Sequence, residues 1–113
     1  MTRIAINGSK GKMGQALIEA INSSSQSDFG AGFDKGDNLI DSLKNFEVLI
    51  DFSRPEASLN ALAVCKDAGK AMVIGTTGFT DSELELIGQA SKEIPIVFAP
   101  NMSVGVNLTL KIL

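Results

Sequence analysis

A short apolar run followed by evenly spaced glycines opens the chain, and this feature limits most strongly what the chain can fold into. Residues 3–6 are rich in isoleucine, as expected of a strand that is covered on both faces. Gly8, Gly11 and Gly14 follow at three-residue intervals and lead into a helical pattern. Gly8 allows a tight turn, Gly11 lets a ligand approach the backbone, and Gly14 lets the helix pack closely on the strand. The stretch is therefore expected to hold a phosphate at the N-terminus of the helix.

The spacing of these glycines leaves a second interpretation open. The usual dinucleotide-binding turn reads GxGxxG, whereas this one reads GxxGxxG. Glycines also occur in such a stretch where they serve only the geometry of a turn before a helix. The rest of the chain has to decide between a phosphate site and a simple helix start.

Composition narrows the class of protein. With 113 residues and 44% hydrophobic positions, the chain is expected to form one domain, residues 1–113, with one modest core. A net charge of −3, with six Phe as the only aromatic residues, argues against a nucleic-acid partner. No apolar run reaches the roughly 18 residues of a membrane span, and the N-terminus has no signal pattern. A cytoplasmic protein without a membrane partner is expected.

The supply of reactive side chains is also limited. The chain has no His and a single cysteine, which excludes an internal disulfide and a His/Cys zinc framework, and no metal is expected. Cys65 lies in an apolar helical stretch and is expected to be an inert, buried thiol. Because Tyr is absent as well, proton transfer within this chain would need Lys, Asp, Glu or a hydroxyl group.

Hydrophobic periodicity predicts strands that alternate with helices. Strands are expected at residues 3–6, 29–33, 48–53, 71–74 and 94–98. Helices are expected at residues 15–24, 55–68 and 81–92 and from residue 104 onward, with a short helix or a loop at 38–46. This alternation predicts an α/β fold, a doubly wound parallel sheet of the Rossmann-like, dinucleotide-binding kind.

Boundary signals mark two of these helices. Ser53 precedes Pro55 and is expected to cap the helix at residues 55–68, which Gly69 closes. Thr80 and Glu83 have the spacing of a capping box and are expected to start the next helix.

An acidic residue stands where a dinucleotide-binding unit contacts the adenosine ribose. Asp34 lies 20 residues after Gly14, at the end of the second predicted strand. Lys35 beside it can pair with a 2′-phosphate, so the two residues are compatible with both NADH and NADPH. The same pair in a loop rich in Gly and Asp also fits a simple turn.

Small or polar residues end the other predicted strands. In a parallel sheet these ends meet at one rim, where ligands bind. Asn101 follows the fifth strand and offers a donor and an acceptor suited to a carboxamide. The remaining rim candidates are Asp51, Phe52, Ser53, Gly75, Thr76 and Thr77.

A second class of function also fits this outline, namely a phospho-accepting signalling module of flavodoxin-like topology. It would use Asp51 as the acceptor and Thr76 as the neighbouring hydroxyl. Such a module needs an acidic pair after the first strand to hold Mg²⁺ and a Lys after the fifth strand. The chain has Asn-Gly at residues 7–8 and Pro-Asn at residues 100–101 instead, which favours the dinucleotide site.

Four motifs, taken together, carry a family resemblance. They read GKMG at residues 11–14, IDFSRPE at 50–56, VIGTTGF at 73–79 and APNMSVGVN at 99–107. In this order they resemble the 4-hydroxy-tetrahydrodipicolinate reductase (dihydrodipicolinate reductase) family of bacterial lysine biosynthesis. The motifs cover most of the chain, and the last two are the most distinctive.

The resemblance implies an oxidoreductase of lysine (diaminopimelate) biosynthesis that transfers a hydride from NADH or NADPH to a cyclic unsaturated dicarboxylate and gives tetrahydrodipicolinate. It places Asp34 on the adenosine ribose, Lys35 on a 2′-phosphate and Phe52 against the cofactor. The residues implied for the pyrophosphate are Gly8, Ser9, Lys10, Gly11, Lys12 and Met13. Those implied for the nicotinamide half are Gly75, Thr76, Thr77, Ala99, Pro100, Asn101 and Met102.

The family's substrate domain, with its catalytic residues, lies downstream of the matched stretch. None of its catalytic residues is matched here, so the chain is expected to be the cofactor half of a reductase. By itself it is expected to bind the cofactor weakly or not at all and to catalyse nothing. The family is usually a homotetramer through the other domain, and whether this chain associates with itself is left open.

Overall fold

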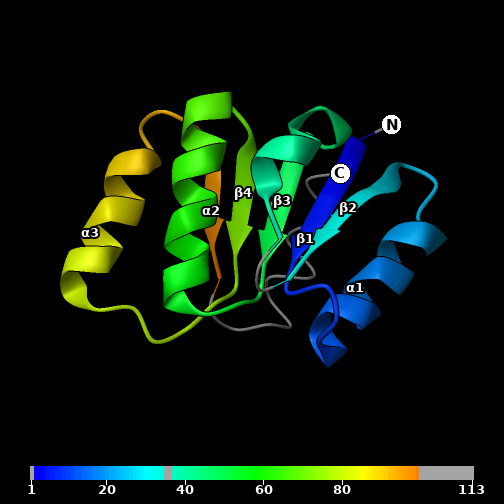
Figure 1. Ribbon diagram of the computed structural model, residues 1–113, viewed down its shortest axis with the longest axis horizontal. Helices are drawn as coiled ribbons and strands as arrows, with labels where there is room; N and C mark the ends of the chain where they lie inside the picture. Colours follow the sequence, from blue (N-terminus) through cyan, green and yellow to red (C-terminus); the bar gives the residue numbers. More distant parts are fainter. Residues whose placement is uncertain (1, 35–36, 100–113) are drawn as a thin grey trace.

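The computed structural model describes residues 2–34 and 37–99, and it shows one sheet of five parallel strands with helices on both faces (Figure 1). The first half of the chain contains β1 (Thr2–Asn7), α1 (Lys12–Ser23), β2 (Ser27–Phe33), the 3₁₀ helix η1 (Leu39–Asn45) and β3 (Val48–Asp51). The second half contains α2 (Pro55–Ala68), β4 (Ala71–Ile74), α3 (Asp81–Ala90) and β5 (Ile96–Phe98). The predicted α/β doubly wound sheet is confirmed.

The order of the strands positions the site. The sheet runs β2-β1-β3-β4-β5, so the chain passes from β1 to β2 on one side and then returns to add β3 on the other side. The connections that follow β1 and β3 therefore diverge. In open parallel sheets this switch point leaves a crevice outside the carboxyl ends of the strands, and ligands bind there.

Strand side chains alternate between the two faces of the sheet. Ile6, Ile50 and Val73 pack on one face in a cluster with Leu17 and Ile21 of α1. Their neighbours in the strands pack on the opposite face, against α2, α3 and η1, in a larger cluster that includes Ala5, Leu49, Met72, Ile74, Leu62, Cys65 and Ile87. This alternation with a period of two residues fixes the register of the strands, because a slip of one residue would exchange the faces.

Several predicted boundaries shift by a few residues. Helix α1 begins at Lys12 rather than at residue 15, because Gly11 already serves as its N-cap and accepts a hydrogen bond from the Gln15 amide at 3.0 Å. Strand β2 begins at Ser27, whose buried hydroxyl donates to the Ile21 carbonyl at 3.3 Å. Strand β3 ends at Asp51, α3 ends at Ala90 and β5 begins at Ile96. The helix predicted from residue 104 lies outside the described residues.

The predicted helix caps have mixed outcomes. The capping box of Thr80 and Glu83 is confirmed, and Gly69 ends α2 in the left-handed conformation with φ 69°. The expected cap at Ser53 is wrong. Arg54 occupies the N-cap position of α2 without a side-chain hydrogen bond, because the Ser53 hydroxyl donates to the buried Asp51 carboxylate instead.

Within the described ranges, no helix combines the length and the apolar character that a membrane span requires.

Candidate functional site

The glycine turn between β1 and α1 is tied to the end of β2. Gly8 has φ 91°, a conformation that favours glycine, and a Cβ on Gly8 would lie 2.6 Å from the carbonyl oxygen of Phe52. The amides of Gly8 and Ser9 both donate to the Phe33 carbonyl, at 2.7 and 3.1 Å. These bonds fix the turn at the switch point between β1 and β3.

The other two glycines of the turn differ from one another. A Cβ on Gly14 would collide with the Gly8 carbonyl oxygen and lie 2.8 Å from the Ser9 Cα, so Gly14 lets α1 approach closely, against the turn that follows β1 rather than against the strand itself. Gly11 has φ −73°, and a Cβ there would meet only the Gly8 carbonyl oxygen at 3.6 Å, an ordinary contact. The fold therefore tolerates a side chain at Gly11, and the absence of one leaves the outer surface of the turn open.

The N-terminus of α1 is suited to an anion. Its N-cap residue provides no side-chain hydrogen bond, and its first turn contains no acidic residue. Lys10 and Lys12 beside it are exposed. Backbone N–H groups at a helix N-terminus and the helix dipole both favour negative charge, and two lysines add to that field.

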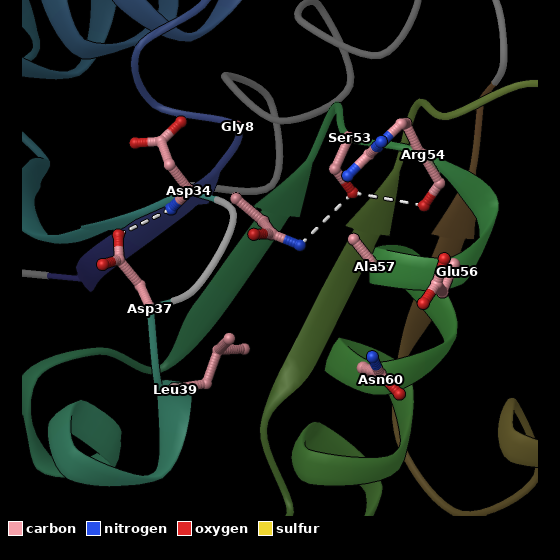
Figure 2. A pocket seen from close by; sticks show the side chains of 10 residues that line it. Gly8, Asp34, Asp37, Leu39, Ser53, Arg54, Glu56, Ala57 and Asn60 are labelled. Atoms are coloured by element: carbon pink, nitrogen blue, oxygen red, sulfur yellow. Dashed lines mark hydrogen bonds between the residues drawn. The ribbon is translucent and has the colours of Figure 1, made fainter.

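Asp34 connects the end of β2 to this turn. One carboxylate oxygen accepts the Ser9 hydroxyl at 2.6 Å, and the other accepts the Lys10 amide at 3.0 Å. The Asp34 amide in turn donates to a carboxylate oxygen of Asp37 at 2.8 Å (Figure 2). Each Asp34 oxygen keeps a further lone pair, so this partly buried carboxylate is still able to accept a hydrogen bond from a ligand.

A cleft of about 630 Å³ opens at the switch point. Figure 2 shows Asp34 and Asp37 on one side of it and Arg54, Glu56 and Asn60 of the α2 segment on the other. Among the described residues, those that line it are Asn7, Gly8, Asp34, Asp37, Leu39, Ser53, Arg54, Glu56, Ala57 and Asn60. Its volume falls in the usual range for small-molecule and cofactor sites. Its walls come from the end of β1, from the connections that follow β1, β2 and β3, and from η1 and α2.

Phe52 and Gly75 pack against each other beside the cleft. A Cβ on Gly75 would collide with the Phe52 ring, whose Cδ1 would lie 2.7 Å away. The half-buried ring also packs against the apolar cluster on the α1 face of the sheet. Gly75 is therefore required for the placement of this ring.

The two threonines after β4 have different surroundings. The hydroxyl of Thr76, which is 4% exposed, accepts the Ser53 amide at 3.0 Å and donates to Asp51 at 2.7 Å. Thr77 is exposed at the rim. The hydroxyl of Thr76 is thus engaged within the protein, which leaves the exposed Thr77 for a ligand. Ala99 is buried, and Lys35, Pro100, Asn101 and Met102 lie outside the described residues.

Cys65 is buried behind β4 as expected. The pKa of its thiol is raised from 9.0 to about 12, mainly by burial and in addition by the negative charge of Asp51, while the positive charge of Lys70 opposes the shift. A thiol with such a pKa is a poor nucleophile at neutral pH. Among residues 2–34 and 37–99, no three His, Cys, Asp or Glu side chains gather in a way that could hold a metal ion.

Comparison with known proteins assigns the chain to a family. A family model described as "Dihydrodipicolinate reductase, N-terminus" matches residues 2–102. The chain belongs to this family. A curated 4-hydroxy-tetrahydrodipicolinate reductase from Hahella chejuensis (strain KCTC 2396) is 44% identical over an alignment 136 positions long, which covers 100% of this chain and 51% of the relative. The chain thus spans about half the length of the curated relative that it matches.

Two solved structures share the fold. The dipicolinate-bound dihydrodipicolinate reductase from Paenisporosarcina sp. TG-14 superposes with a TM-score of 0.76 at 23% identity, covering 99% of this chain and 52% of that one. The pyrroline carboxylate reductase from Plasmodium falciparum, with NADP bound, superposes with a TM-score of 0.56 at 16% identity, covering 86% and 41%. At these identities the likeness shows that the fold is shared.

The described part of the chain does not support the phospho-accepting alternative. Asp51 is 0% exposed, and its two carboxylate oxygens accept hydrogen bonds from four side chains. A phosphoryl donor has no access to such a group.

The prediction from sequence did not include part of the cleft wall. Asn7, Arg54 and Glu56 stand within or beside stretches that the sequence had marked, yet no role in lining a site was assigned to them. Asn7 ends β1, and Arg54 and Glu56 follow within five residues of the end of β3; this was the available signal, because the carboxyl ends of strands form the rim. Asp37, Leu39, Ala57 and Asn60 carry no motif, and only the packing of η1 and α2 brings them to the cleft.

Proposed function

We propose that this chain is the NADH- or NADPH-binding domain of a 4-hydroxy-tetrahydrodipicolinate reductase. The observation that carries the proposal is the glycine turn at the switch point: Gly8 and the Asp34 carboxylate line the cleft, and the same turn leads into the uncapped N-terminus of α1, where Lys10 and Lys12 are exposed. This arrangement suits a ligand with a pyrophosphate next to a ribose. Family membership and the NADP in the Plasmodium structure of the same fold agree with it.

The roles of the individual residues follow from their positions. The pyrophosphate would contact the backbone from Gly8 to Met13, and its closest approach would be at Gly11, where no Cβ intervenes. Asp34 would accept hydrogen bonds from the adenosine ribose through its remaining lone pairs. Lys35 would pair with the 2′-phosphate of NADPH.

The nicotinamide half would extend toward the ends of β4 and β5. Gly75, Thr76 and Thr77 would contact it, with Thr76 acting through its backbone because its hydroxyl is engaged with Asp51. Ala99, Pro100, Asn101 and Met102 would complete this half, and Phe52 would support it through its contact with Gly75.

When bound, the dinucleotide supplies the hydride that reduces a cyclic unsaturated dicarboxylate to tetrahydrodipicolinate. The residues of this chain hold and orient the cofactor, and we assign the substrate contacts and the proton donor to the other half of the enzyme, since this chain has no His. The dipicolinate in the Paenisporosarcina reductase is a ligand of this chemical class. A reductase of this kind would act in the cytoplasm, where its nicotinamide cofactors are available, and it would assemble as a homotetramer.

Gly11→Val tests the proposed site at a position where the fold has room for a Cβ. The variant should lose at least about tenfold in NADH affinity, because the new side chain occupies the space through which the pyrophosphate approaches the backbone. Calorimetric titration at millimolar NADH measures the affinity of the wild-type chain and of the variant.

Gly88→Val provides the matched control. Gly88 lies in α3, and a Cβ there meets nothing within 4 Å, so NADH affinity should be unchanged. A folded Gly11→Val chain that binds NADH as the wild type does would remove the glycine turn from the site.

A further inference from the structure

A fully buried carboxylate lies beneath the candidate cofactor site and has no role in the proposed function so far. Asp51, the last residue of β3, is 0% exposed. One of its oxygens accepts Asn7 Nδ2 at 2.9 Å and the Ser53 hydroxyl at 2.5 Å. The other accepts the Thr76 hydroxyl at 2.7 Å and the Ser58 hydroxyl. All four donors are neutral.

These four hydrogen bonds occupy all the acceptor positions of the carboxylate. Each oxygen accepts two donors, and no surface of Asp51 is exposed, so the side chain cannot touch a ligand in this arrangement. Burying a carboxylate costs free energy unless its hydrogen bonds are complete. A protein with apolar residues of similar volume in place of such a buried polar cluster is often just as stable. A role in holding the neighbouring strand ends in place would account for a carboxylate at this point of the core.

The donors come from the ends of three neighbouring strands and from α2. Asn7 ends β1 and directly precedes Gly8 of the glycine turn. Ser53 directly follows Phe52, and Thr76 directly follows Gly75 at the end of β4. The Asp51 carboxylate therefore accepts a hydrogen bond from a direct neighbour of Gly8, of Phe52 and of Gly75, the three residues at this rim.

Further bonds connect the same strand ends. The Gly75 amide donates to the Asp51 backbone carbonyl at 2.8 Å, and the Phe52 amide donates to the Asn7 carbonyl at 3.0 Å. Thr76 links Asp51 to the Ser53 amide through its hydroxyl. Displacing the carboxylate would disturb the position of β1 relative to β4 at the rim.

We infer that Asp51 is a positioning residue that holds the glycine turn after β1 and the segment after β4 in register for one ligand that spans both. This rests on the proposed function, in which the adenosine and pyrophosphate lie at β1 and the nicotinamide lies beyond β4. A ligand confined to the β1 side, such as ADP, does not depend on that register.

Asp51→Asn tests the inference. The amide keeps the size of the carboxylate but places an N–H₂ donor where hydroxyl donors now point. NADH affinity should fall about tenfold, since small displacements of positioning groups are costly, while ADP affinity stays within about twofold of the wild type. Titration of each chain with NADH and with ADP gives the ratio of the two affinities.

Two hydroxyl variants separate positioning from general stability and serve also if Asp51→Asn fails to fold. Thr76→Val and Ser58→Ala each remove one hydroxyl that donates to the same Asp51 oxygen, but Thr76 lies at the rim and Ser58 lies in α2. Both should lower the thermal unfolding midpoint, whereas only Thr76→Val should lower the NADH-to-ADP affinity ratio. Thr76→Ser keeps the hydroxyl and should restore that ratio.

Equal losses of NADH and ADP affinity, or no loss of either, would contradict the positioning role. Absence of NADH binding to the wild-type chain would overturn the proposed function instead. In that case amide hydrogen exchange, which needs no ligand, still tests the positioning role. Asp51→Asn should speed exchange of the Gly75 and Phe52 amides relative to amides in the core of α2. Unchanged exchange rates at Gly75 and Phe52 would overturn the positioning role.

Discussion

At Gly11 the backbone has φ −73° and an added Cβ meets only an ordinary contact, whereas at Gly8 and Gly14 it meets backbone atoms closer than 3.0 Å. Two of the three glycines are thus explained by the fold, and one is left for a ligand. The sequence predicted the turn at Gly8 and the close approach of α1 at Gly14 because turn geometry and helix packing are local. It could not predict that the hydroxyls of Ser53 and Thr76 point inward, because their shared partner Asp51 is placed by the pairing of distant strands.

The buried thiol of Cys65 predicts a loss of stability at alkaline pH. An unfolded chain ionises this thiol near its ordinary pKa of 9.0, whereas in the folded chain burial raises the pKa to about 12. Well below its ordinary pKa of 9.0 the thiol is protonated in both states and contributes no pH dependence. Between these two values only the unfolded state releases the proton, so the free energy of unfolding should fall as pH rises.

Urea unfolding at a series of alkaline pH values measures this effect. Cys65→Ala removes the titrating group and should reduce the slope of the free energy of unfolding against pH. If the two chains show the same slope across this range, ionisation of the buried thiol does not contribute to alkaline destabilisation.

At the scale of elements, the helices whose boundaries the sequence predicted well are those with local caps. Helix α2 has Pro55 at its start and Gly69 at its end, and it runs over the predicted residues. Helix α1 starts three residues before its predicted start because its N-cap is part of a turn that is held by the Phe33 carbonyl of β2. That hydrogen bond crosses the sheet, and apolar periodicity along α1 carries no signal for it.

The capping box of α3 yields a stability prediction for this element. The Thr80 hydroxyl accepts the Glu83 amide at 3.2 Å, and the Glu83 carboxylate accepts the Thr80 amide at 2.8 Å. Thr80→Ala removes the first of these bonds and should lower the free energy of unfolding by about 1 kcal/mol. Chemical denaturation measures the change, and NADH affinity should stay the same because Thr80 does not line the cleft. A stability equal to that of the wild type would show that the box does not stabilise α3.

At the scale of the whole molecule, the alternation of strands and helices predicted the parallel sheet and the rim at which its polar residues gather. The order β2-β1-β3-β4-β5 gives that rim its cleft, because the connections diverge between β1 and β3. On the far wall of the cleft, the contributions of Ala57 and Asn60 could not be predicted in the same way. These residues reach the cleft through the packing of α2 on the sheet, which depends on contacts between distant parts of the chain.

The central claim is that this chain binds a nicotinamide dinucleotide along the rim from β1 to β4, and an NADH titration followed by amide chemical shifts tests it most directly. The account predicts shifts that saturate at millimolar NADH and that concentrate at the amides of Gly8 to Met13, Asp34, Gly75 and Thr77. The exposed face of α3 should stay unchanged. Shifts centred on other surfaces, or no shifts at millimolar NADH, would contradict the claim.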